Sequence, residues 1–465
     1  MAHASTIFTD LGLYGLEPIE PVLLAALATA EPLLLIGAHG TAKSLLLTRV
    51  AAALSLPFRH YNASLLNFDD LVGFPLPGKD GSLEYVKTPA AIWGAGAVIF
   101  DEISRCRPDI QNKLFPIIHE RRVQGLLLEG LRYRWAAMNP PATDDGDEDR
   151  YLGSEPLDAA LADRFAFVVE MPAWGTLDEA VQLAIIRADD PPVPAEAGAR
   201  LAALVARVSL ALPVARAMLG AQLAVYVRAV LALLVQAGIA LSPRRAGMLH
   251  RNVAAVHAAA LALDAGADAG ESAWLALANG LPQRAEGRPA PSAKVFAAHR
   301  EAWRIAAVPA GDPLSLVLLE CDPVARLRLA TAATLSRSDL STVVADTLAQ
   351  LRPGQRDAAV VHLFEAEVAG RLTAAVAEQA AERYRHIATP LRFSETIHAT
   401  NPRYRVWQAL KNLLSTLDPG DARAHQCANA LAACFSRKEL ATEDDLRRAM
   451  DDFVLTRAQL AGSAA

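Results

Sequence analysis

Five short apolar runs, each followed by a stretch with helical periodicity, constrain the first 175 residues more than any other feature. Runs rich in Val, Ile, Leu and Phe are typical of buried strands, and helical crossovers between them favour parallel pairing. We therefore expect an α/β domain with a five-stranded, mainly parallel sheet and helices on both faces. The predicted strands are LLLIG at 33–37, FRHYNA at 58–63, AVIFDE at 97–102, RYRWAAMN at 132–139 and FAFVVEMP at 165–172.

Two further β-type segments and a change in composition predict the rest of the organisation. GFPLPGKDGSLEYVKTPA at 73–90 and ERRVQGLLLEGLRYRW at 120–135 read as hairpins inserted into the core. After about residue 176 the chain is rich in Ala, Leu and Arg with helical periodicity. We expect an α/β domain over 1–175, an all-α lid over 176–280, a Pro- and Gly-rich linker at 281–292 and an all-α C-terminal domain of unknown role over 293–465.

Composition indicates a cytoplasmic protein with a sizeable core. Of the 465 residues 52% are hydrophobic and 21% are charged, and the net charge of −6 provides no global attraction to nucleic acid. The four cysteines form no CxxC pair, which is typical of reduced thiols, and we expect no secretory leader. The apolar stretch at 223–241 contains Arg228 and Gln236, which favours a buried helix over a membrane span.

The segment GAHGTAKS at 37–44 resembles the phosphate-binding loop G-x-x-x-x-G-K-[ST], with Ala42 in place of the last glycine. Such a loop binds phosphate through backbone N–H groups at a helix N-terminus. We expect Ala42 to adopt helical dihedral angles, which alanine tolerates. Lys43 would contact the β and γ phosphates and Ser44 would bind Mg²⁺. Alone, the match is short enough to arise by chance.

AVIFDE places Asp101 and Glu102 at the end of a predicted parallel strand, where nucleotides bind in open α/β sheets. Asp101 would orient the Mg²⁺ shell, and Glu102 would polarise the attacking water as a general base. Two acids that end a strand at a solvated loop are the alternative. The phosphate loop upstream makes the catalytic interpretation the stronger one.

Asn139 and Arg164 extend the same interpretation. Asn139 is the last residue of the predicted strand and lies within the segment AAMNPP. Its amide can hold water or a phosphate without adding charge. Arg164 follows a predicted helix, and its guanidinium suits a finger inserted into a neighbouring subunit's site. Taken singly, an Asn-Pro turn and a surface arginine are the ordinary explanations for these two residues.

Together these motifs resemble the AAA+ ATPases, within them the MoxR type that includes the dynein-related group. That family's loop often has alanine at the position of Ala42. FDDLVGFPLP, FDEISRCRPDIQNKLFPIIHERRV, AAMNPP, DRF and SPRRAGML occur in the family's order over roughly residues 10–265. The two hairpins are similar to the family's helix-2 insert and pre-sensor hairpin.

The resemblance implies a role for each matching residue. Lys43 and Ser44 belong to Walker A, Asp101 and Glu102 to Walker B, and Asn139 is sensor 1. Arg164 is implied to be the arginine finger and Arg244 sensor 2, so that the implied catalytic residues are Glu102, Asn139, Arg164 and Arg244. The implied nucleotide-binding residues are Gly37, Ala38, His39, Gly40, Thr41, Ala42, Lys43, Ser44, Leu45 and Asp101, with Ser44 and Asp101 also at Mg²⁺.

Several residues depart from the family's pattern. His39 stands where proline is usual, Ser104 where asparagine is usual and Arg245 where alanine is usual, so that either Arg244 or Arg245 can be sensor 2. Arg105 is either a surface residue or one that reaches across a subunit interface. The acidic run DDGDED at 144–149 is expected to be a solvated loop.

The resemblance implies a cytoplasmic Mg²⁺-dependent ATPase that forms a ring, a hexamer, and remodels a partner protein. Family members work with von Willebrand factor A domain proteins, so such a client is the first expectation. The alternatives are a chelatase-type motor subunit, a nucleic-acid motor and a nucleotide-switched scaffold with little turnover. Arginines in the predicted lid are not interleaved with aromatic residues, which disfavours nucleic acid.

Overall fold

The computed structural model describes residues 6–77, 83–86, 88–141, 153–188, 192–309, 311–389, 397–415 and 421–462. These residues form two compact units, which divide between Ala306 and Ala307. The run DDGDED at 144–149 and the tip of the first predicted hairpin lie outside the described residues.

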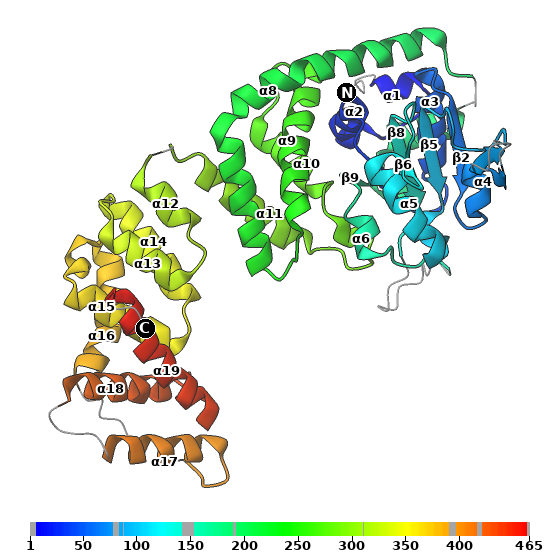
Figure 1. The fold of residues 1–465 in the computed structure, drawn as a ribbon. Helices are drawn as coiled ribbons and strands as arrows, with labels where there is room; N and C mark the ends of the chain where they lie inside the picture. Colours follow the sequence, from blue (N-terminus) through cyan, green and yellow to red (C-terminus); the bar gives the residue numbers. More distant parts are fainter. Residues whose placement is uncertain are drawn as a thin grey trace. The chain divides into compact units, whose positions relative to one another are not determined.

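The first unit contains a five-stranded sheet with the order β2-β5-β8-β1-β9, in which every pair of neighbours is parallel (Figure 1). Each predicted strand is confirmed, and so is the α/β fold class. The two strands added last along the chain, β8 and β9, pair with opposite edges of β1. The strands are β1 (Leu33–Ile36), β2 (Phe58–Asn62), β5 (Ala97–Asp101), β8 (Tyr133–Met138) and β9 (Phe167–Glu170).

Nearly all side chains of β1, β5 and β8 are apolar and buried, which shows that both faces of the sheet are covered. One face packs against α4 (Phe68–Val72), α5 (Pro108–Glu120) and α6 (Ala159–Ala162) in a continuous apolar core. On the other face, Tyr133 of β8 donates a hydrogen bond to the Leu27 carbonyl of α2 (Glu20–Thr29). Helix α3 (Lys43–Ala53) contacts β5 and β8.

Both predicted hairpins are present and lie outside the main sheet. Strands β3 (Phe74–Pro77) and β4 (Leu83–Val86) pair antiparallel, as do β6 (Arg122–Val123) and β7 (Leu126–Leu127). Each leaves apolar side chains exposed: Phe74, Leu76 and Val86 on the first, Leu126 and Leu127 on the second.

The helices after the sheet pack on the same unit. Helix α8 (Ala195–Gln236), which bends at Gly220, contacts α2, α3, α9 (Pro243–Leu263) and α11 (Ser292–Ala306) (Figure 1). Helix α10 (Ala269–Ala278) lies against α9, and a shorter helix, α7 (Glu179–Arg187), precedes α8. Among the described residues, α8 alone is long and apolar enough to cross a membrane, and 39% of its most apolar window is buried. It packs against α1 (Ile7–Asp10), α2, α3, α9 and α11, as a helix inside a folded unit does, and its length and composition alone are weak evidence for a membrane span.

The predicted linker at 281–292 is partly buried in the first unit. Ala285 is fully buried in the core beneath the sheet, and its carbonyl accepts a hydrogen bond from Leu157 N. Helix α11 follows directly and packs along α8, so it belongs to the first unit rather than to the predicted domain at 293–465. The segment is buried at Pro282 and Ala285 and exposed at Arg288, Pro289 and Pro291, and composition alone does not distinguish such a partly buried connection from a linker.

The second unit consists of helices around two apolar cores. One core joins α15, α17, α18 and α19, and the other joins α12, α13, α14 and α15. The helices of this unit are α12 (Pro313–Leu319), α13 (Pro323–Ala332), α14 (Arg337–Gln350), α15 (Pro353–Glu365), α16 (Ala374–Ala388), α17 (Pro402–Ser415), α18 (Ala422–Ser436) and α19 (Glu443–Leu460).

Candidate nucleotide-binding site

The phosphate-type loop joins the carboxyl end of β1 to the first turn of α3. At Gly37 an added Cβ would lie 2.7 Å from Thr41 Oγ1 and 2.9 Å from Met171 Cβ, so only glycine fits. Gly40 has a φ of +78°, which glycine adopts without strain. The loop therefore lies at the N-terminus of α3, where backbone N–H groups can bind an anion.

Ala42 does not occupy the helical conformation that we expected from the sequence. It is the residue before α3 and lies in the left-handed region, with φ 59° and ψ 22°. A Cβ in this region approaches the following carbonyl oxygen, at a cost of about 1–2 kcal/mol. This conformation explains why the motif usually has glycine at this position. In this chain the backbone at Ala42 is strained.

Lys43 links the loop to the neighbouring strand β8. Its Nζ donates hydrogen bonds to the carbonyl oxygens of Gly37 (2.7 Å) and Ala38 (2.8 Å) and to Asn139 Oδ1 (3.2 Å). Burial lowers the pKa of Lys43, and the negative charges of Asp101 and Glu102 oppose that shift. The predicted Walker A lysine and sensor 1 asparagine are therefore brought together.

Ser44 and Asp101 meet between α3 and β5. Ser44 Oγ donates a hydrogen bond of 2.6 Å to Asp101 Oδ2, and His60 Nε2 lies 3.2 Å from the same oxygen. Burial acts to raise the pKa of Asp101, but its hydrogen bonds with His60, Ser44 and the Glu102 N–H outweigh burial and lower it. Asp101 is thus held ionised. His60 reaches the site from β2, and no sequence motif marks it.

Glu102 and Asn139 are held by different neighbours. Glu102 has a left-handed backbone conformation (φ 52°), and its carboxylate lies 4.0 Å from Arg105 Nη1. Behind Asn139, Ser154 Oγ lies 3.1 Å from the Asn139 carbonyl oxygen and 3.0 Å from Ser104 Oγ. Ser104 therefore supports the strand end that carries Asn139. Ser154, which sequence reasoning missed, has no motif of its own.

A cavity of about 450 Å³ opens beside the loop and extends the site beyond the predicted residues. Its lining includes the loop residues from Ala38 to Ala42 and Leu45, and His39 is exposed there. Two segments without recognisable motifs complete it: Gly12 to Leu16 near the N-terminus, and Met171 to Trp174 after β9. This volume lies in the range of small-ligand sites.

The predicted finger Arg164 lies near the amino-terminal ends of the parallel strands, whereas the phosphate loop lies at their carboxyl ends. Strands β1 and β9 are parallel, with Leu33 opposite Phe167 and Ile36 opposite Glu170. The loop follows Ile36, whereas Arg164 precedes Phe167, so the strands alone separate them by roughly 10 Å. Arg164 instead stacks on the Phe115 ring, 4.5 Å from its centroid.

Arg244 and Arg245 have different environments, although they are adjacent on α9. Arg244 is partly exposed and pairs with Asp163 at 3.0 Å. Arg245 is 1% exposed and donates hydrogen bonds to Asp163 and to the carbonyl oxygens of Phe165 and Gly280. Of the two candidates for sensor 2, only Arg244 has its guanidinium available to a ligand.

Arg164 and Arg244 belong to one cationic cluster at this edge. Burial lowers the pKa of Arg164, and Arg244 lowers it further. Burial also lowers the pKa of His119, with Arg244 and Arg164 as the next causes. Cations this close repel one another, which suits a surface that receives an anion.

Oxygen ligands suited to Mg²⁺ are present at the carboxyl end of the sheet. Mg²⁺ prefers hard oxygen ligands and keeps waters, and it uses substrate phosphates together with one or two protein groups. The Ser44 hydroxyl and the ionised Asp101 carboxylate supply such a pair. Among the described residues no group of three or more His, Cys, Asp and Glu side chains forms a separate metal site.

The sheet order, the glycine-shaped loop and the convergence of Lys43, Asp101 and Asn139 are those of a P-loop fold of the AAA+ type in the first unit. Residues 32–165 match the model of the AAA domain (dynein-related subfamily). This stretch is therefore an AAA domain, which confirms the predicted resemblance at the level of AAA+ ATPases.

Solved structures include one described as a "putative ATPase" from Cytophaga hutchinsonii ATCC 33406. It aligns with 18% identity and a TM-score of 0.44 over 63% of this chain and 92% of that one. No curated protein matches the chain. The assignment therefore rests on the matched domain and on the chain's own sheet and loop.

Proposed function

We propose that this chain is a MoxR-type AAA+ ATPase that hydrolyses ATP between adjacent subunits of a ring, a hexamer. The observation that carries the proposal is the position of Arg164 and Arg244 at the edge of the sheet opposite the phosphate loop. An arginine there is too far from its own subunit's nucleotide to act on it. It is well placed to act on the nucleotide of a neighbouring subunit.

The residues around the loop have complementary roles in this proposal. The loop N–H groups and Lys43 bind the phosphates, and Lys43 exchanges its present carbonyl partners for phosphate oxygens. Ser44 and Asp101 would hold Mg²⁺, which when bound would neutralise charge on the phosphates. Glu102 accepts a proton from the attacking water, and Asn139 orients that water from the end of β8.

The cavity beside the loop suits the adenine base and ribose. Leu13, Tyr14, Trp174 and Leu177 provide apolar and aromatic surface next to the phosphate-binding residues. Trp174 is 51% exposed, which leaves its ring available for a ligand. We therefore assign the N-terminal segment and the residues after β9 to the base of the nucleotide.

Subunit mixing tests the proposed action between subunits. Lys43→Ala subunits lack phosphate binding but retain Arg164, whereas Arg164→Ala subunits have the reverse defect. Each variant alone should be nearly inactive, and verified mixed rings should recover measurable phosphate release. Absence of recovery in such rings would contradict an arginine that acts in trans.

The client of the ring is proposed to be a protein, with a von Willebrand factor A domain protein as the first candidate. The exposed Phe74, Leu76 and Val86 of one hairpin and Leu126 and Leu127 of the other offer apolar contacts outside the nucleotide site. A purified candidate client should raise ATP turnover. Leu126→Ser with Leu127→Ser should abolish that increase while the basal rate persists, and a loss of the basal rate itself would contradict this role.

A further inference from the structure

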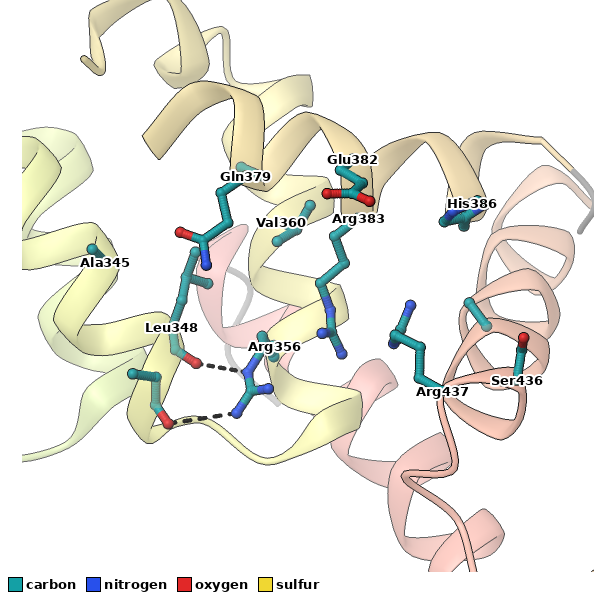
Figure 2. A pocket seen from close by; sticks show the side chains of 13 residues that line it. Ala345, Leu348, Arg356, Val360, Gln379, Glu382, Arg383, His386, Ser436 and Arg437 are labelled. Carbon is teal, nitrogen blue, oxygen red and sulfur yellow. Dashed lines mark hydrogen bonds between the residues drawn. The ribbon is translucent and has the colours of Figure 1, made fainter. Parts of the chain in front are cut away.

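A second cavity, of about 710 Å³, lies within the C-terminal unit and is lined by three arginines from three helices. Arg356 comes from α15, Arg383 from α16, and Arg437 directly follows α18. Figure 2 shows the Arg383 and Arg437 guanidinium groups facing each other, whereas Arg356 lies on the other side of Arg383 with its guanidinium turned toward Leu348. Cations repel at short range, so this convergence requires compensation.

Two carboxylates compensate part of this charge. Asp357 is fully buried and accepts hydrogen bonds from both Arg383 and Arg437. Glu439 accepts from the same two arginines, at 3.0 Å and 3.2 Å. Burial acts to raise the pKa of Glu439, but Arg383 and Arg437 outweigh it and lower that pKa. Arg383 and Arg437 are therefore paired and fixed in position.

Arg356 has no such carboxylate partner among the described residues. Its Nε donates to the Leu348 carbonyl oxygen (2.7 Å) and its Nη2 to that of Leu351 (2.8 Å), at the C-terminal end of α14. These bonds orient the guanidinium without neutralising it. The acidic residue in the lining, Glu382, is exposed on α16, and Figure 2 shows it on the side of that helix away from Arg356.

Each arginine also retains an unused donor. Within the described part of the chain, Nη1 of Arg356, Arg383 and Arg437 makes no hydrogen bond to protein. Arg437 Nε is moreover buried without a partner there. Guanidinium groups anchored by their other nitrogens lose little freedom when Nη1 binds an anion.

We propose that this cavity binds a small organic phosphate. The three arginines line the cavity from α15, from α16 and from the residue after α18, and charged donors on separate segments suit a tetrahedral oxyanion better than a flat carboxylate. His386 and Ser436 line the same cavity and add polar atoms, while Leu348, Val360 and Ala433 provide apolar surface. The cavity is much larger than a phosphate ion, so an organic group attached to the phosphate would occupy the apolar part.

Calorimetry on the full-length chain tests this site with phenyl phosphate as the probe and phenol as its uncharged control. The Lys43→Ala background is used throughout, because the phosphate loop of the first unit also binds phosphates. Phenyl phosphate should bind in this background and phenol should not. Arg356→Gln should weaken binding roughly tenfold or more, as expected for the loss of a charged hydrogen bond.

Arg385→Gln is the matched control, because Arg385 is an exposed arginine of α16 outside the cavity lining. It removes the same charge and should leave the affinity unchanged. Equal affinity in the Arg356→Gln chain would overturn the proposal, as would absence of binding at millimolar phenyl phosphate. Tighter, Arg356-dependent binding of a hexaglutamate peptide would overturn the assigned ligand class in favour of an acidic protein segment.

A measurement without substitutions covers the case in which Arg356→Gln fails to fold. Phenylglyoxal modifies accessible arginines, and mass spectrometry locates the modified positions. Phenyl phosphate should protect Arg356, Arg383 and Arg437 but not Arg385. Equal modification of all four with and without the probe would contradict the site.

Discussion

Arg245 and Asp163 form an ion pair that is almost closed to solvent, with Arg245 Nη2 3.3 Å from Asp163 Oδ1. Asp163 Oδ2 faces Arg244 instead, at 3.0 Å. One carboxylate thus holds two consecutive arginines of α9 against the amino edge of the sheet. One of them is buried and the other is partly exposed.

This difference in burial predicts that substitution of Arg245 lowers stability, whereas substitution of Arg244 lowers ATP turnover. Arg245→Ala leaves the Asp163 charge without its buried partner, so we expect the free energy of unfolding to fall by about 3–5 kcal/mol. Arg244→Ala should change stability by less than about 1 kcal/mol, since that pair is partly solvated. It should lower ATP turnover about a hundredfold, as the loss of one donor to a transition state does. Denaturant unfolding and phosphate release measure the two effects, and full activity of a folded Arg244→Ala chain would contradict the assignment.

Glu102→Gln separates turnover from binding. The amide is nearly isosteric with the carboxylate but cannot accept a proton from water, so turnover should fall by about 10²–10⁴-fold. ATP affinity should change little, because Lys43 and the loop N–H groups remain. Asp109→Asn, at an exposed carboxylate of α5, is the control and should retain turnover. Undiminished phosphate release by Glu102→Gln would overturn the catalytic role of Glu102, whereas little phosphate release by the unsubstituted chain would favour a nucleotide-switched scaffold.

The left-handed conformation of Ala42 predicts how the loop responds to substitution. Ala42→Gly removes the Cβ strain but gives the unfolded chain more freedom, so stability should rise by no more than about 1 kcal/mol. ATP affinity should be retained. Ala42→Val places a β-branched residue at positive φ and should weaken ATP binding. Calorimetric titration with ATP measures both variants, and weaker binding by Ala42→Gly than by Ala42→Val would be inconsistent with the observed backbone.

The hydrogen bonds at Asp101 predict a pH dependence of stability. The pKa of this carboxyl is lower in the folded chain than its ordinary value of 3.8, so its contribution is fully present above about pH 4. That contribution is lost as the pH falls through the lower folded pKa. Between pH 5 and pH 3, the free energy of unfolding should therefore fall less for Asp101→Asn than for the wild type.

Urea unfolding at both pH values measures this difference, with Asp109→Asn as an exposed control. The control should follow the wild-type change. An identical loss of stability in the wild type and in Asp101→Asn would show that the bonds from Ser44 and His60 do not favour the ionised carboxyl.

The positions of the strands could be predicted because their signal is local. Each run, such as AVIFDE, carries its own apolar pattern and ends in the residues that the fold presents at the carboxyl edge. Parallel pairing then brings Lys43, Asp101 and Asn139 together, as expected. His60 and Ser154 join them only because β2 and the segment before α6 approach from elsewhere in the chain.

The errors have equally specific causes. The helical pattern predicts helical dihedral angles for Ala42, but this residue lies just outside α3, at the end of the loop, and adopts positive φ. The linker at 281–292 has the composition of a loop, yet the apolar core beneath the sheet encloses Ala285. In both cases the conformation depends on neighbours that a local pattern does not contain.

The α/β class, the five strands and the phosphate-type loop can therefore be recognised in the sequence, because apolar periodicity and short motifs act within a few residues. Tertiary packing buries Arg245, leaves Arg244 partly exposed and places Arg164 at the opposite ends of the strands from the loop. It also brought together Arg356, Arg383 and Arg437, which are scattered along a chain segment without a recognisable motif. Strand register and helix packing join residues far apart in sequence, so no local pattern records their convergence.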